Sequence, residues 1–212
     1  MYEFLAKGGI LMIPLLLCSV ISVTVFLERL WALTRGRVAP AAFLERLLPV
    51  FAAGKFEEAR LICQENDTPL ARIISVVARF AGRTDSASMS DALDEQGRQE
   101  TARLGRDIEI VGTVAAVTPL LGLLGTVLGM IKVFKRVEDY GVGDPTILAN
   151  GIWEALITTA AGLSVAIPAF LFYKLLQTRV ESLTLELEAG TRRVIETLPA
   201  AAQPSPPAEG AA

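Results

Sequence analysis

Three long runs of apolar residues stand out along the chain, separated by stretches that carry nearly all of its charge. These runs correspond to residues 8–27, 110–131 and 151–173. In the third, the apolar part starts at Ala155. Each reaches the roughly 20 residues that a helix needs to cross the hydrocarbon core of a bilayer. The pattern predicts an all-α integral membrane protein with three transmembrane helices.

The first run has a competing interpretation, a cleaved signal peptide. Residues 8–27 lack a basic start and a clear cleavage site of small residues, and the run is long for the apolar region of such a peptide. A transmembrane helix is the favoured interpretation.

The polar stretches have helical patterns of their own. In residues 28–109, helices are expected at 41–53, 56–64, 70–81 and 88–107, with breaks at Gly54 and around Asn66 to Pro69. No proline separates 88–107 from the second span, so one continuous helix is expected there. Residues 174–198 continue the third span at helical spacing. Two transmembrane helices should therefore extend into a helical cytoplasmic bundle.

The remaining segments are short. Residues 1–7 and 132–150 are expected on the periplasmic side, the second as a loop. Residues 199–212, rich in proline and alanine, are expected to be disordered because they cannot form a core.

The distribution of Arg and Lys predicts the orientation. Basic residues gather in the flanks that follow the first span, precede the second and follow the third: Arg29, Arg35, Arg37, Arg98, Arg103, Arg106, Lys174 and Arg179. The opposite side carries Lys7, Lys132, Lys135 and Arg136, which weaken this bias without reversing it. The N-terminus is expected in the periplasm and the C-terminus in the cytoplasm of a multi-pass inner-membrane protein.

Composition removes several classes of function. The chain has no histidine and two cysteines, Cys18 and Cys63, so we expect no zinc site, no disulfide framework and no cofactor. Basic and acidic residues are almost equal in number between Glu28 and Glu109, which disfavours nucleic acid as a partner. No soluble-enzyme motif is present, and we expect no catalytic residue.

Small residues form a stripe on the second span. Thr118, Gly122, Gly125 and Gly129 fall within an arc of about 60° on an ideal helix, which lets another helix approach closely. The partner helix could belong to the same chain or to a neighbouring subunit, and Gly162 offers a matching site on the third span. Two prolines inside the spans, Pro119 and Pro168, are expected to kink them.

Hydroxyl and carboxyl groups are the candidates for chemistry. Thr126 lies beside the glycine stripe, either as a structural residue bonded to its own helix or as a hydroxyl on a proton path. Glu154 is the only charged residue between Asp144 and Lys174, and it either faces a protein interior or sits at the headgroup level. Helical geometry puts Thr158 on the Glu154 side and Thr159 roughly 140° away.

The sequences TPLLGLLGTVLGM (118–130) and GIWEALITTAAGLSVAIPA (151–169) resemble the MotA/TolQ/ExbB proton-channel family. Three spans rather than four are similar to its ExbB/TolQ branch, and KGGILMIP (7–14) is similar to ExbB-type members. By this resemblance Thr126 and Thr159 match pore threonines, and Glu154 matches the glutamate of the third span.

The resemblance also implies partners: a pentamer around the single-span helices of an ExbD- or TolR-like protein with a membrane-embedded Asp, and a TonB- or TolA-like protein beyond it. The absence of any Asp or Glu in the apolar runs 8–27, 110–131 and 155–173 fits such a partner. The leading hypothesis is a proton-channel (stator) subunit that couples proton motive force to mechanical work on the cell envelope or to TonB-dependent transport. The alternative is a non-conducting membrane scaffold that recruits partners through its cytoplasmic bundle.

Overall fold

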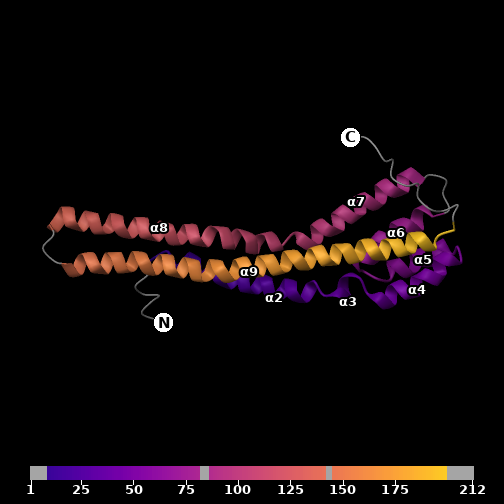
Figure 1. The fold of residues 1–212 in the computed structure, drawn as a ribbon, viewed down its shortest axis with the longest axis horizontal. Coiled ribbons are helices and arrows are strands. Elements are labelled where there is room, and N and C mark those ends of the chain that lie inside the picture. The colour runs from indigo at the N-terminus through magenta and orange to yellow at the C-terminus, as the bar shows by residue number, and fades with distance from the viewer. Residues whose placement is uncertain (1–8, 82–85, 142–144, 200–212) are drawn as a thin grey trace. The chain divides into compact units, whose positions relative to one another are not determined.

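The computed structural model describes residues 9–81, 86–141 and 145–199, and all regular secondary structure in these ranges is helical (Figure 1). The helices are α2 (Met12–Ala32), α3 (Arg35–Val38), α4 (Ala41–Ala52), α5 (Phe56–Gln64), α6 (Pro69–Phe80), α7 (Ser86–Gly105), α8 (Ile108–Tyr140) and α9 (Pro145–Thr197). Three of them, α2, α8 and α9, are long and apolar enough to cross a membrane. The predicted fold class is confirmed. The expected N-terminal segment, residues 1–7, lies outside the described residues. The expected disordered tail, 199–212, also lies outside them except for Pro199.

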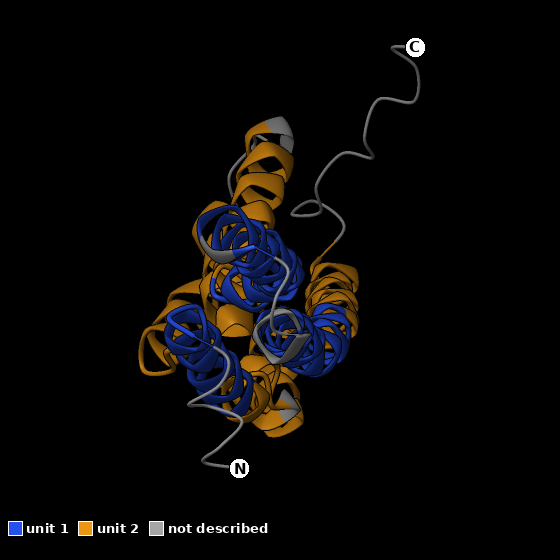
Figure 2. Cartoon of the chain, turned by 90° about the vertical axis from the view of Figure 1, so that its left-hand side faces the viewer, with its two compact units in different colours: residues 1–29, 107–177 blue, residues 30–106, 178–212 orange. Residues whose placement is uncertain are grey.

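The chain divides into two compact units, coloured separately in Figure 2. Residues 1–29 and 107–177 form the first, called here the membrane unit because it holds the apolar parts of the three spans. Residues 30–106 and 178–212 form the second, called here the polar unit.

Ring stacking and an ion pair join the helices of the membrane unit. The rings of Phe26 on α2 and Phe172 on α9 stack with centroids 4.0 Å apart and 12° between their planes. Arg29, near the end of α2, forms an ion pair with Asp107, which precedes α8. These contacts link α2 both to α9 and to the start of α8.

Many apolar side chains of the spans face outward from the single chain. Leu17, Leu120 and Ile167 are 58%, 62% and 61% exposed. A water-facing surface of this kind would be unfavourable by about 25 cal/mol for each Å² of apolar area. The exposed faces therefore require lipid or other protein chains around them.

A loop was expected at 132–150, but most of these residues are helical, so that prediction was wrong. Helix α8 continues through Lys132 to Tyr140, and α9 already begins at Pro145. The charged residues after 131 end the apolar run, but most of them are compatible with a helix. Helix α8 stops only at Gly141, whose φ of +72° is readily adopted by glycine.

The expected continuous helix from 88 into the second span is interrupted. Helix α7 ends at Gly105, and α8 begins at Ile108 after a turn at Arg106 and Asp107. The ion pair between Asp107 and Arg29 joins residues far apart in the sequence. Local helix propensity could not reveal this contact.

In the polar unit, α6 is the most enclosed helix. Eight of its twelve residues are buried, including Leu70, Ile74 and Val77. Its start is fixed by the Thr68 side chain, which accepts a hydrogen bond from the Ala71 amide at 3.2 Å, and by a proline in the first turn. The observed bounds of α4, α5 and α6 lie within about one residue of the expected helices.

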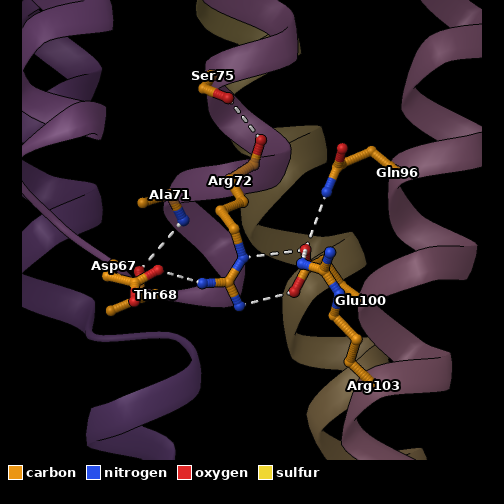
Figure 3. A network of polar contacts seen from close by, with 8 residues as sticks. All are labelled: Asp67, Thr68, Ala71, Arg72, Ser75, Gln96, Glu100 and Arg103. Atoms are coloured by element: carbon orange, nitrogen blue, oxygen red, sulfur yellow. Dashed lines mark hydrogen bonds and ion pairs between the residues drawn. The ribbon is translucent and has the colours of Figure 1, made fainter.

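A buried carboxylate lies beside α6 (Figure 3). Glu100 of α7 is 0% exposed, and its two oxygens accept hydrogen bonds from Arg72 Nε and Nη2 at 2.9 and 2.8 Å. Gln96 and Arg103 donate to the same carboxylate at 2.9 and 3.0 Å. Arg72 also forms an ion pair with Asp67. Hydrogen bonding to Glu100 raises the pKa of Arg72 above its usual value.

Cys63 of α5 is buried, at 4% exposure. Burial raises the pKa of its thiol to about 11, so the thiol is neutral at pH 7. Cys63 therefore serves as a small apolar residue in the core of the polar unit.

Replacing Arg72 tests the importance of this network. In Arg72→Met, the buried Glu100 loses its two-point partner, and we expect the free energy of unfolding to fall by about 3–5 kcal/mol. Urea titration of the full-length protein in detergent, followed by circular dichroism, measures the change. Arg98→Met is the matched control, because Arg98 and its partner Glu95 are 76% and 58% exposed. Its cost should stay below about 1 kcal/mol, and equal effects of the two substitutions would contradict the assigned role.

Candidate functional site

Helices α8 and α9 touch through their backbones at a pair of glycines. A Cβ atom added at Gly162 would lie 2.7 Å from the carbonyl oxygen of Thr118 and 3.0 Å from Gly122 Cα. A Cβ added at Gly122 would lie 3.1 Å from Thr159 Cα. No side chain larger than hydrogen fits at Gly162 unless the helices separate.

The close contact continues toward the C-terminal end of α8 and the N-terminal end of α9. A Cβ at Gly125 would lie 2.6 Å from Thr158 Cβ, and one at Gly129 would lie 2.7 Å from Ala155 Cβ. One turn further, a Cβ at Gly151 would overlap the side chain of Val133. Each step of three or four residues up α8 is thus matched by a step of three or four residues down α9, as in a tightly packed antiparallel pair.

The glycine stripe of the second span therefore packs inside one chain. The sequence left open whether its partner was the same chain or a neighbouring subunit. The partner in the structure is α9, which supplies Gly162, Thr158 and Ala155. Small residues at such an interface let van der Waals contacts form between helix backbones.

Both threonines of the third span lie at this interface, although an ideal helix separates them widely. Thr158 is 2% exposed, and its hydroxyl donates to the carbonyl oxygen of Glu154 at 2.7 Å. The hydroxyl of Thr159 donates across the helix pair to the carbonyl oxygen of Gly122 at 2.8 Å. The absence of a side chain at Gly122 leaves its carbonyl accessible to α9.

The hydroxyl of Thr126 donates within α8, to the carbonyl oxygen of Leu123 at 2.6 Å. The structure thus uses the two candidate pore threonines differently: Thr126 bonds to its own helix, and Thr159 links two helices. In each case the hydroxyl oxygen keeps lone pairs that can accept a further hydrogen bond.

Glu154 lies on α9 between Gly151 and Ala155, two residues that contact α8. Its Oε1 is 2.9 Å from Nζ of Lys132 on α8, and the two side chains are 32% and 58% exposed. Gly9, before α2, approaches the same carboxylate. Sequence reasoning missed both neighbours, although the order of spans offered a signal: the end of the second and the start of the third lie on the same side.

The remaining candidate residues carry no contact that assigns them a role. Pro119 and Pro168 lie inside α8 and α9, and both helices continue through them, so the expected kinks stay predictions. Within the ranges that the structure describes, no group of three His, Cys, Asp or Glu side chains is placed to hold a metal ion.

Comparison with known proteins adds to this geometry. Residues 65–189 match the model of the MotA/TolQ/ExbB proton channel family, which covers more than half of the chain and includes the whole α8–α9 contact. This chain belongs to that family. As a member of a proton channel family it is a transport protein and not an enzyme.

Individual relatives agree with the family assignment. The putative biopolymer transport protein ExbB-like 1 of Synechocystis sp. is 38% identical over 178 residues, which cover 82% of this chain and 69% of the relative. The biopolymer transport protein exbB1 of Vibrio cholerae is 29% identical over 85% of this chain and 80% of its own length. The Tol-Pal system protein TolQ of Haemophilus influenzae is 39% identical over 40% of this chain and 37% of its own length.

The tight helix pair of this family member can be tested at Gly125. In Gly125→Ala the new methyl group meets Thr158, so the helices must shift, and we expect a loss of about 1–3 kcal/mol in stability. Stability is measured by unfolding in mixed SDS and mild-detergent micelles. Gly97→Ala in α7 is the control, because a Cβ there meets nothing within 4 Å and alanine favours a helix. Equal stability of Gly125→Ala and wild type would contradict the backbone contact.

Proposed function

We propose that this chain is the channel (stator) subunit of an ExbB/TolQ-type complex in the bacterial inner membrane. It couples proton motive force to mechanical work on the cell envelope or to TonB-dependent transport. Its partner is a single-span ExbD- or TolR-like protein that supplies a membrane-embedded Asp, and a TonB- or TolA-like protein receives the work.

The observation that carries this proposal is the placement of acids in a member of a proton channel family. Residues 8–27, 110–131 and 155–173 contain no Asp or Glu, while Glu154 lies just beyond one end of the third span. Apolar side chains and hydroxyls cannot replace the hydration of an ion. A complete proton path therefore needs an acid from another chain.

The exposed apolar faces of the membrane unit support assembly around such a partner. We propose a pentamer, as the family resemblance implies, in which part of these faces lines subunit contacts and a central pore. Thr126 and Thr159 then contribute hydroxyls to the path, and Glu154 contributes a carboxylate near its periplasmic end. The bound hydroxyl of Thr159 also keeps α9 against α8 at this level.

Proton flux into liposomes tests the proposal. The protein alone should be nearly proton-tight under an imposed potential, and addition of a single-span ExbD- or TolR-like protein with a membrane-embedded Asp should permit a slow flux. A complex that assembles without conducting would favour the alternative, a structural scaffold.

Glu154 is tested in the same assay. Glu154→Gln removes the charge at nearly constant shape, and we expect the flux of the complex to fall by about ten-fold or more. Glu154→Asp keeps the charge and should lose less. Normal assembly and full flux in Glu154→Gln would identify Glu154 as a headgroup-level anchor instead.

The proposed orientation puts the C-terminal end of α8 and the N-terminal end of α9 in the periplasm and the polar unit in the cytoplasm. Single cysteines at the exposed positions Glu65 and Glu138, with Cys18 and Cys63 replaced by alanine, should then differ in reactivity. An impermeant thiol reagent added to intact spheroplasts should label position 138 and leave position 65 unlabelled until the membrane is broken. The reverse pattern would invert the topology.

A further inference from the structure

The ion pair between Lys132 and Glu154 lies within the α8–α9 contact, beside the close approaches of Gly129 to Ala155 and of Val133 to Gly151. Lys132 directly follows the apolar run of the second span, and Glu154 directly precedes that of the third. The Nζ to Oε1 distance of 2.9 Å permits a charge-assisted hydrogen bond. The family resemblance gives a role to Glu154 and none to Lys132.

The packing of the two helices fixes this pairing. Lys132 lies between Gly129 and Val133 on α8, and these two residues touch Ala155 and Gly151 of α9. Glu154 lies between those two residues. The close contacts on either side bring the Lys132 and Glu154 backbones to the same level, so the pair depends on the glycine-set register.

Gly9 confines the carboxylate from another direction. Its φ is +67°, and a Cβ added there would lie 2.6 Å from Glu154 Oε1. The carboxylate oxygen thus occupies the space that a side chain on Gly9 would need. The Lys132 ammonium group and the Gly9 backbone together restrict where the Glu154 carboxylate can lie.

We propose that Lys132 is the positioning residue of Glu154: its ammonium group holds the carboxylate beside the Gly129–Ala155 and Val133–Gly151 contacts of α8 and α9, ready for proton exchange. This inference rests on the proposed function. Both side chains are partly exposed, so the pair is weakly held and can exchange with water or with a cationic group of the partner. Lys132 therefore orients the carboxylate without blocking access to it.

Substitution of Lys132 separates charge from packing. Lys132→Met keeps an unbranched stem and removes the ammonium group, and Lys132→Arg keeps the positive charge. In liposomes that contain this chain and its acid-bearing single-span partner, we expect Lys132→Met to lower proton flux by about ten-fold, as loss of an orienting partner can. Lys132→Arg should retain most of the flux. Lys135→Met, at an exposed position one turn further along α8, controls for a general effect of surface charge.

A double-mutant cycle distinguishes positioning from an independent structural role. If Lys132 acts through Glu154, the double variant Lys132→Met/Glu154→Gln should conduct like Glu154→Gln alone, because the second change removes nothing further. Multiplied losses in the double variant would overturn the inference. The oligomer mass and thermal stability of Lys132→Met should equal those of wild type. A loss of assembly as large as the loss of flux would also overturn the inference.

A measurement without transport tests the pair itself. A water-soluble carbodiimide should join the Lys132 amine and the Glu154 carboxyl as an amide, with loss of water, in the full-length protein in liposomes. Mass spectrometry of the digest should find the linked peptides in wild type and lose them in Lys132→Arg. Absence of the link in wild type would overturn the inference.

The flux assay also separates the two proposals. A wild-type complex that conducts, combined with unchanged flux in Lys132→Met, overturns the role of Lys132 alone. A wild-type complex that does not conduct overturns the proposed function and this inference with it.

Discussion

The close approach of α8 and α9 is the constraint on which the candidate site depends. Backbone contact at Gly122 and Gly162 sets the distance between the helices, and the contacts of Gly125 and Gly129 set their register. This register lets Thr159 reach the Gly122 carbonyl and Lys132 reach Glu154. Because hydrophobic burial gives little drive to pair helices in lipid, van der Waals packing of small residues and hydrogen bonds must hold them together.

The kind of polar group changes along this helix pair, from hydroxyls in the middle to charged groups beside the apolar runs. In its middle, threonine hydroxyls donate to backbone carbonyls, so no charge is placed among the apolar residues of the spans. Charges flank the apolar runs, where Lys132 of α8 meets Glu154 of α9 and Arg29 of α2 meets Asp107 before α8. Such a distribution keeps the cost of membrane insertion low, and it is consistent with the proposed partner that supplies the acidic group.

Different interactions stabilise the polar unit. Helix α6 is buried by its neighbours in the ordinary manner of a helical bundle, and one carboxylate, Glu100, is buried with it. Hydrogen bonds from Arg72, Gln96 and Arg103 compensate for the lost hydration. The pairing of these residues joins α6 to α7.

The sequence by itself determined the helical class, the three spans, the short helices of the polar unit and the family, because apolar run length, helical period and the two long motifs are local properties of the chain. It also identified Glu154 and the small-residue stripe. It could not decide that the stripe packs within one chain, that the helix breaks at Arg106, or that Lys132 lies against Glu154. These features depend on contacts between residues distant in sequence, and only the tertiary structure fixes which of several compatible neighbours each side chain meets.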